Sequence, residues 1–182
     1  NDLSGGEFQQ FELHKQTMPC PFSEAEYTQH EKALKLLHEN KFQAARALLE
    51  PLVAKYPDRA TDKHNLALTY LYDTDGEARA EAMFLEICKA HPDYLFSKAE
   101  LARLAIKRND LSAAKEFLVF PKNLGRVHVM EYVTFLSVMG ILAHAEGDLT
   151  KEKTILKNIA EIDDEESSAY ISLDRLLNPI DP

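Results

Sequence analysis

The sequence has no tryptophan, only two cysteines and only six glycines. Two thiols, Cys20 and Cys88, are too few for a disulfide framework or a four-thiolate zinc site. Basic residues are also scarce, because 21 Lys and Arg stand against 30 Asp and Glu, for a net charge of −9. Nucleic-acid binding usually requires a basic stripe. The composition therefore argues against disulfide-rich domains, zinc modules and nucleic-acid binding.

Long apolar runs are missing as well. The most apolar stretch is 132–145, and Thr134, Ser137 and His144 interrupt it. It is too short to span a bilayer and indicates a buried helix instead. The start shows no signal-peptide layout, and because it is Asn1 rather than Met, we expect a processed chain or a piece of a longer one. We expect a soluble protein, cytoplasmic rather than exported.

No motif of a known enzyme class occurs. The sequence has no phosphate-binding Walker loop, no Gly-x-Ser-x-Gly and no dinucleotide fingerprint. Cys88 fits a small core position, whereas Cys20, between Pro19 and Pro21, leaves a reactive or intermolecular thiol open. We expect no enzyme activity, no metal and no cofactor.

A repeat with a period near 34 residues is what the sequence does contain. Tyr56-Pro57-Asp58 returns as His91-Pro92-Asp93, 35 residues later. The segment 39–42 (ENKF) is echoed at 108–111 (RNDL) and 146–149 (EGDL), each time between two helical patterns. A fixed period of this length is typical of stacked helix pairs. We predict a helix–turn–helix unit used four times, and no strand.

Residues at the expected helix starts support this prediction. Ser23 and Glu26 are spaced as a capping box, with Phe22 and Tyr27 at the staple positions. Four acidic residues each precede a later helical pattern, where a carboxylate accepts from free backbone N–H groups. They are Asp58, Asp93, Asp110 and Asp148.

The repeat resembles the tetratricopeptide repeat (TPR) family, whose unit places small, large and proline residues at set positions. The matching residues are Ala33, Leu36, Ala45, Leu49 and Pro57; Leu66, Ala67, Tyr70, Ala80, Phe84 and Pro92; Leu101, Ala102, Ala105, Ala114 and Leu118; and Met139, Gly140, Ala143, Leu156 and Ile159. The resemblance implies an all-α superhelix of antiparallel helix pairs over 23–182. Its repeats would cover about 24–57, 58–92, 93–125 and 126–164, with a capping helix near 165–177.

Two segments depart from the regular pattern. Pro121 falls inside the second helix of the third repeat, so we expect that helix to end near Val119 and residues 120–126 to form an irregular link. Residues 1–22 show no helical period and are interpreted as an arm or linker. Phe8, Phe11 and Leu13 would lay this arm on the domain, or its phenylalanines would fill the groove.

By the family's register, the first helix of each pair lines a concave groove. The residues expected to face it are Tyr27, His30, Leu34, His38, Thr61, His64, Asn65, Leu68, Leu71, Tyr72, Phe96, Ala99, Glu100, Arg103, Ile106, Lys107, Ser137, Ile141 and His144. Many are apolar or aromatic, which is typical of an interaction surface. Packing under the arm or against neighbouring helices is the alternative explanation.

Two special uses of this groove can be weighed from the sequence. His30 and His64 share a column, which leaves a metal pair or a pH-sensitive contact open, although no further ligands have metal-site spacing. The carboxylate clamp by which some TPR proteins hold chaperone tails is matched only at Asn65. Its other positions hold His30, Leu34, Phe96 and Glu100, so we do not expect chaperone C-terminal tails as partners.

The resulting expectation is a non-catalytic adaptor, scaffold or assembly factor that binds a peptide or helix of another protein. Three alternatives stay open at this point. They are a self-associating homodimer, a small secretion-type chaperone as found in bacteria, and a regulatory fragment of a larger protein.

Overall fold

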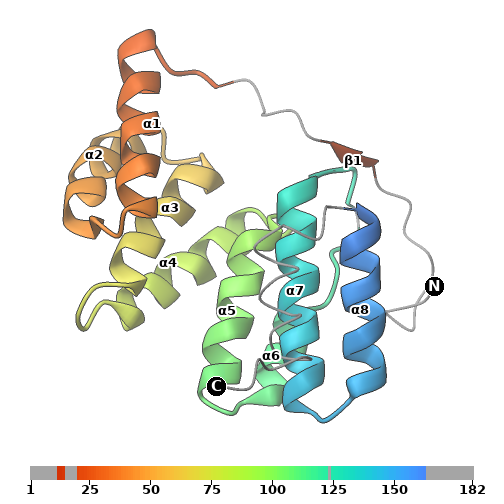
Figure 1. Cartoon of the computed structure of the whole chain (residues 1–182). Helices are drawn as coiled ribbons and strands as arrows, with labels where there is room; N and C mark the ends of the chain where they lie inside the picture. The colour runs from red at the N-terminus through yellow and green to blue at the C-terminus, as the bar shows by residue number, and fades with distance from the viewer. Residues whose placement is uncertain (1–11, 15–19, 123, 163–182) are drawn as a thin grey trace. The chain divides into compact units, whose positions relative to one another are not determined.

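The protein is an all-α chain of packed, sequence-adjacent helix pairs, seen here in a computed structural model that describes residues 12–14, 20–122 and 124–162 (Figure 1). Eight helices occur among these residues. They are α1 (Glu24–His38), α2 (Phe42–Lys55), α3 (Ala60–Leu71), α4 (Glu77–Ala90), α5 (Leu95–Lys107), α6 (Leu111–Phe117), α7 (Val129–Ala145) and α8 (Leu149–Ile162). The predicted capping helix at 165–177, and Phe8 and Phe11 of the arm, lie outside the described residues.

The chain divides into two compact units. The N-terminal unit is Met18–Ser97, and the C-terminal unit is Lys98–Pro182 together with Asn1–Thr17. The N-terminal unit contains α1 to α4, and the C-terminal unit contains α6 to α8. Each unit has a buried core of its own, so the groove residues predicted from the sequence are distributed over two bodies.

The predicted helix starts at Ser23, Asp110 and Asp148 are confirmed. Ser23 Oγ accepts from the Glu26 amide while the Glu26 carboxylate accepts from the Ser23 amide, which completes the capping box. Asp110 accepts from the Ala113 amide at the start of α6, and Asp148 accepts from the Lys151 amide at the start of α8. Asp58 is different, because Arg59 occupies the N-cap of α3 and provides no side-chain hydrogen bond.

Three turns between paired helices share one geometry. Asn40, Asn109 and Gly147 all have positive φ, at 58°, 59° and 76°. In each turn the amide of this residue donates to the carbonyl three residues back, and the next amide donates to the carbonyl five back. This is the Schellman way of ending a helix, for which Gly and Asn are best suited. The echo of 39–42 at 108–111 and 146–149 is therefore an echo of backbone conformation.

The second helix pair is joined by a longer loop, and it requires a glycine. Asp75 takes the positive φ here, at 60°. A Cβ added to Gly76 would lie 2.0 Å from the carbonyl oxygen of Tyr70. The loop therefore closes against the end of α3 only because residue 76 has no side chain.

Alanines are fully buried at equivalent positions of successive helix pairs. Ala33, Ala67 and Ala102 on the first helices of three pairs are fully buried. So are Ala45, Ala80 and Ala114 on the second helices. Burial at the same register in successive pairs is the arrangement that repeated helix pairs need in order to stack.

The region around Pro121 follows the expected break in outline. The second helix of the third pair, α6, ends at Phe117, close to the predicted end near Val119, and α7 begins only at Val129. The prediction of no strand was wrong. Two three-residue strands, β1 (Glu12–His14) and β2 (Arg126–His128), pair in parallel with Leu13 opposite Val127. Such short strands leave no readable alternation, and their pairing joins distant segments.

Candidate protein-binding surface

The structure places the predicted groove residues in three kinds of environment. Tyr27, His38, Tyr72 and Arg103 are exposed, and His30 and His64 are buried. Six more are half-buried: Leu34, Asn65, Leu68, Leu71, Phe96 and Ile106. Of these twelve residues, all except Arg103 and Ile106 belong to the N-terminal unit, whereas the predicted groove residues Ala99, Glu100, Lys107, Ser137, Ile141 and His144 belong to the C-terminal unit.

In the N-terminal unit the exposed positions repeat between α1 and α3. Leu34 and Leu68 are 34 residues apart and are both half-buried, while His38 and Tyr72 are 34 apart and both exposed. Each helix turns its fully buried alanine, Ala33 or Ala67, away from solvent. With Tyr27, these residues form what we call the α1–α3 face: Tyr27, Leu34, His38, Leu68 and Tyr72.

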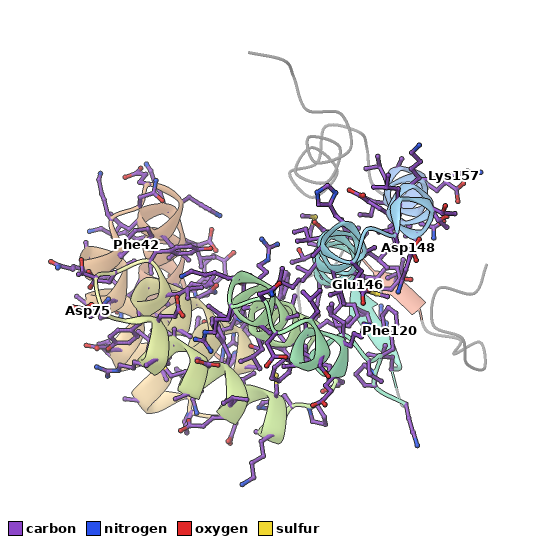
Figure 2. The ribbon with its side chains drawn as sticks, turned by 90° about the horizontal axis from the view of Figure 1, so that it is seen from below. Phe42, Asp75, Phe120, Glu146, Asp148 and Lys157 are labelled. Atoms are coloured by element: carbon purple, nitrogen blue, oxygen red, sulfur yellow. The ribbon has the colours of Figure 1, made fainter. Side chains whose placement is uncertain are left out.

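Two tyrosines make the α1–α3 face unusually aromatic for exposed surface. Tyr27 is 54% exposed and Tyr72 is 58% exposed. The Tyr72 ring stacks on that of Phe42 at the start of α2, with 5.5 Å between centroids; Phe42 is labelled in Figure 2. Beside this stack lies an open hollow of about 390 Å³, lined by Asn40, Lys41, Phe42, Gln43, Ala44 and Asp73. Side chains of a partner would find both an aromatic platform and a recess here.

A buried cluster around Asp62 ties α1 to α3. Asp62 on α3 is fully buried, its Oδ1 lies 2.9 Å from His30 Nδ1, and its Oδ2 contacts Arg59 Nε. The His30 contact does not have hydrogen-bond alignment, because neither of its two atoms has a hydrogen-bond partner. Burial raises the pKa of the Asp62 carboxyl, but His30 and Arg59 outweigh it and hold this pKa below its usual value.

Phe22 covers the cluster. Its ring lies 5.5 Å from that of His30 and 5.2 Å from that of Tyr56, and the Arg59 guanidinium sits 4.5 Å from its centroid. The predicted staple partner, Tyr27, is exposed instead. His30 is therefore buried inside the N-terminal unit, where it contacts both Asp62 and Phe22.

His64 occupies the interior and not the groove surface. Its ring lies within 5.7 Å of the rings of Phe84, Tyr94 and Phe96, and its Nδ1 is 2.9 Å from Ser97 Oγ. Burial lowers the pKa of His64 to about 3, so the ring is neutral at physiological pH. The shared column with His30 is real in sequence, but the two rings have different partners, Asp62 and Ser97.

A second set of contacts holds the N-terminal unit together. Arg46 on α2 donates to the Thr69 carbonyl at 2.7 Å and to Asp73 Oδ2 at 2.8 Å. Its guanidinium and that of Arg79 lie over the Tyr70 ring, 3.9 and 4.0 Å from the centroid. This cation–π arrangement joins α2, α3 and α4.

The C-terminal unit carries a smaller set of candidates. Arg103 is exposed, with its Nε 3.6 Å from Glu100 Oε1, and Ile106 is half-buried. Burial raises the pKa of Glu100, an effect that Arg103 only partly offsets. On α7, Ser137 is buried and its Oγ has no hydrogen-bond partner, while His144 is exposed.

Glu152 is the residue that the sequence analysis missed. It lies on α8, three residues after Leu149, in the register where α2 has Ala45 and α6 has Ala114, and it is fully buried like them. Its Oε2 is 3.2 Å from His144 Nδ1, whereas its Oε1 has no hydrogen-bond partner. Extending the comparison of segments 39–42 and 146–149 by three residues would have shown that Glu152 stands where Ala45 does.

Neither metal clusters nor membrane helices appear in the part of the chain that the structure describes. Within 12–14, 20–122 and 124–162, no three His, Cys, Asp or Glu side chains are grouped so that they could hold a metal ion. Among the same residues no helix is long and apolar enough to cross a membrane. The comparisons found no match to this chain among protein-family models, curated proteins or solved structures.

Proposed function

We propose that this protein is a non-catalytic binding module of the TPR type, which holds a peptide or helix of another protein on the α1–α3 face. The observation that carries the proposal is the repetition of solvent-accessible positions at a 34-residue spacing, with Leu34 and Leu68 both half-buried and His38 and Tyr72 both exposed. Residues that serve only the core have no reason to be exposed at the same register twice.

The architecture supports the TPR assignment within this proposal. Paired helices, fully buried alanines at equivalent positions and one shared turn geometry are features that the family's repeat would require. The resemblance remains one of pattern, since it covers small and large positions and no long identical segment.

The chemistry of the face defines the kind of partner. Its five residues are aromatic, aliphatic or imidazole and include no carboxylate, lysine or arginine. A segment that presents apolar or aromatic side chains along one side fits such a surface, as in helix-in-groove recognition. A carboxylate-ended chaperone tail does not, because the clamp positions Leu34 and Phe96 offer no side-chain donor.

Affinity capture from the native cell with a double variant tests the proposal. Leu68→Glu with Tyr72→Ala places a charge and removes an aromatic platform on the face, so we expect partner capture to fall at least tenfold. Circular dichroism should show unchanged helicity, because neither residue is fully buried. A single variant, Tyr27→Glu, gives a second reading at a position that is more than half exposed.

The matched control makes one Leu-to-Glu change and one truncation to Ala at exposed positions outside the face. Leu85 and Val119 are 47% and 62% exposed, so Leu85→Glu with Val119→Ala should leave capture at the wild-type level. Equal capture by wild type, face variant and control would refute the proposed binding surface.

A further inference from the structure

Strand β1 is attached to the fold differently from every helix. Its three residues belong to the C-terminal unit, whereas the chain that follows from Met18 belongs to the N-terminal unit. The two strands that pair are thus separated in sequence by the whole N-terminal unit. β1 lies outside all eight described helices, so its removal takes no residue from any of them.

The pairing partner is a well-supported strand. β2 directly precedes α7, and Leu124, Val127 and Val129 around it are all buried. Val127 faces Leu13 in the register, and Leu13 is only half-buried. β2 is therefore anchored by buried side chains of its own segment, while β1 contributes one half-buried apolar side chain and a short ladder.

A strand edge that loses its partner selects another strand. The one segment shown to fit β2 is residues 12–14 of this chain, in the register Glu12 to Arg126, Leu13 to Val127 and His14 to His128. A second copy presents the same segment with the same backbone donors and acceptors. Exchange between copies then replaces each ladder contact one for one, which is why swapped elements are a low-cost route to dimers.

We propose that β1 of one copy pairs with β2 of a second copy, so that the chain forms an arm-exchanged dimer in equilibrium with the monomer. The partner is this same chain, and the site is the β2 edge at Arg126–His128. The proposal is independent of the α1–α3 face, which lies in the other compact unit.

Cysteine trapping in the full chain tests the exchange. In a background with Cys20→Ser and Cys88→Ala, one sample carries Leu13→Cys and a second, with a tag of different mass, carries Val127→Cys. The samples are mixed, incubated, oxidised mildly and resolved without reductant. Because directly paired strand residues are close enough for a disulfide, we expect a covalent heterodimer of the two masses.

Two controls define the outcome. Leu13→Cys mixed with Leu85→Cys, an exposed position in the other unit, measures disulfides formed by random collision and should yield at least fivefold less heterodimer. The double variant Leu13→Cys with Val127→Cys should close, within or between copies. Heterodimer no stronger than the collision control, or a double variant that does not close at all, overturns the proposal.

Sedimentation gives a reading that does not depend on trapping. The unmodified chain should show a dimer fraction that rises with concentration, and Leu13→Asp should reduce this fraction at least threefold without loss of helicity. A chain that stays monomeric at every concentration, with wild type and Leu13→Asp alike, contradicts the exchange and leaves the binding function of the α1–α3 face untouched.

Discussion

Buried histidines at equivalent sequence positions have separate tasks in this molecule. His30 contacts the buried Asp62 carboxylate, while His64 is packed among three aromatic rings against Ser97. The sequence predicted their shared column, because spacing is local information. It did not predict their burial, which depends on Phe22, Phe84 and Tyr94 arriving from other parts of the chain.

The depressed pKa of His64, about 3 in the folded state, leads to a pH prediction. An unfolded histidine titrates near 6.5, so the unfolded chain binds a proton at this residue that the folded chain does not. The contribution of His64 to the free energy of unfolding is therefore fully present above about pH 6.5. It is lost as the pH falls toward 3, by roughly 1.4 kcal/mol per pH unit in the middle of that window.

Urea unfolding between pH 7 and pH 4 measures this contribution. His64→Gln keeps a neutral polar side chain and should flatten the decline over that range, while His38→Gln, at an exposed position, should leave it as in wild type. Asp62 acts in a different pH window. Its lowered pKa contributes stability that is lost only as the pH falls below about 4. An unchanged slope in His64→Gln would contradict the assignment.

Glu152 and His144 should respond to substitution with opposite signs. Replacing a buried charged group by an apolar one of similar volume is often neutral or stabilising, so Glu152→Leu should raise the free energy of unfolding by about 1 kcal/mol. His144→Ala removes the nearest partner of a fully buried carboxylate and should lower it by about 1–3 kcal/mol. Urea unfolding at pH 7 distinguishes them, with the exposed Glu161→Leu as control. Loss of stability in both variants would disprove this account.

At the scale of elements, most of the helical framework was predictable and one connection was not. The Asn40, Asn109 and Gly147 turns, the Ser23 cap and the early end of α6 follow from local sequence, because caps and turns are made by residues within a few positions of each other. The β1–β2 pair escaped prediction, because nothing within either segment specifies a partner more than 100 residues away in the sequence.

The loop of the second helix pair provides a test at this scale. Gly76→Ala would put a methyl group 2.0 Å from the Tyr70 carbonyl oxygen, and backbone cannot move away as easily as a flexible side chain. We expect a loss of about 1–3 kcal/mol, as for other overpacked sites. Gly125→Ala is the matched control, because no atom lies within 4 Å of its added Cβ. Thermal unfolding that ranks the two variants equally would show that the loop adjusts.

At the scale of the whole molecule, the candidate site was predicted in part. The exposed tyrosines and the paired leucines of the α1–α3 face are positions that the helical register indicated. The register alone could not separate Tyr72, which is open to solvent, from His64, which is enclosed, since this depends on packing from α4 and α5. The net charge of −9 says little about which partner the α1–α3 face would select, because none of the five residues of the face carries a carboxylate.

The shared turn at Asn40, Asn109 and Gly147 has a consequence for how such a protein changes in evolution. The two backbone hydrogen bonds that define each turn join atoms within six consecutive residues. A gene duplication or deletion with ends inside two such turns would therefore recreate a complete turn at the new junction. The length of the chain can change in whole helix pairs without a new loop having to be invented, and the proposed binding surface would grow or shrink in the same discrete steps.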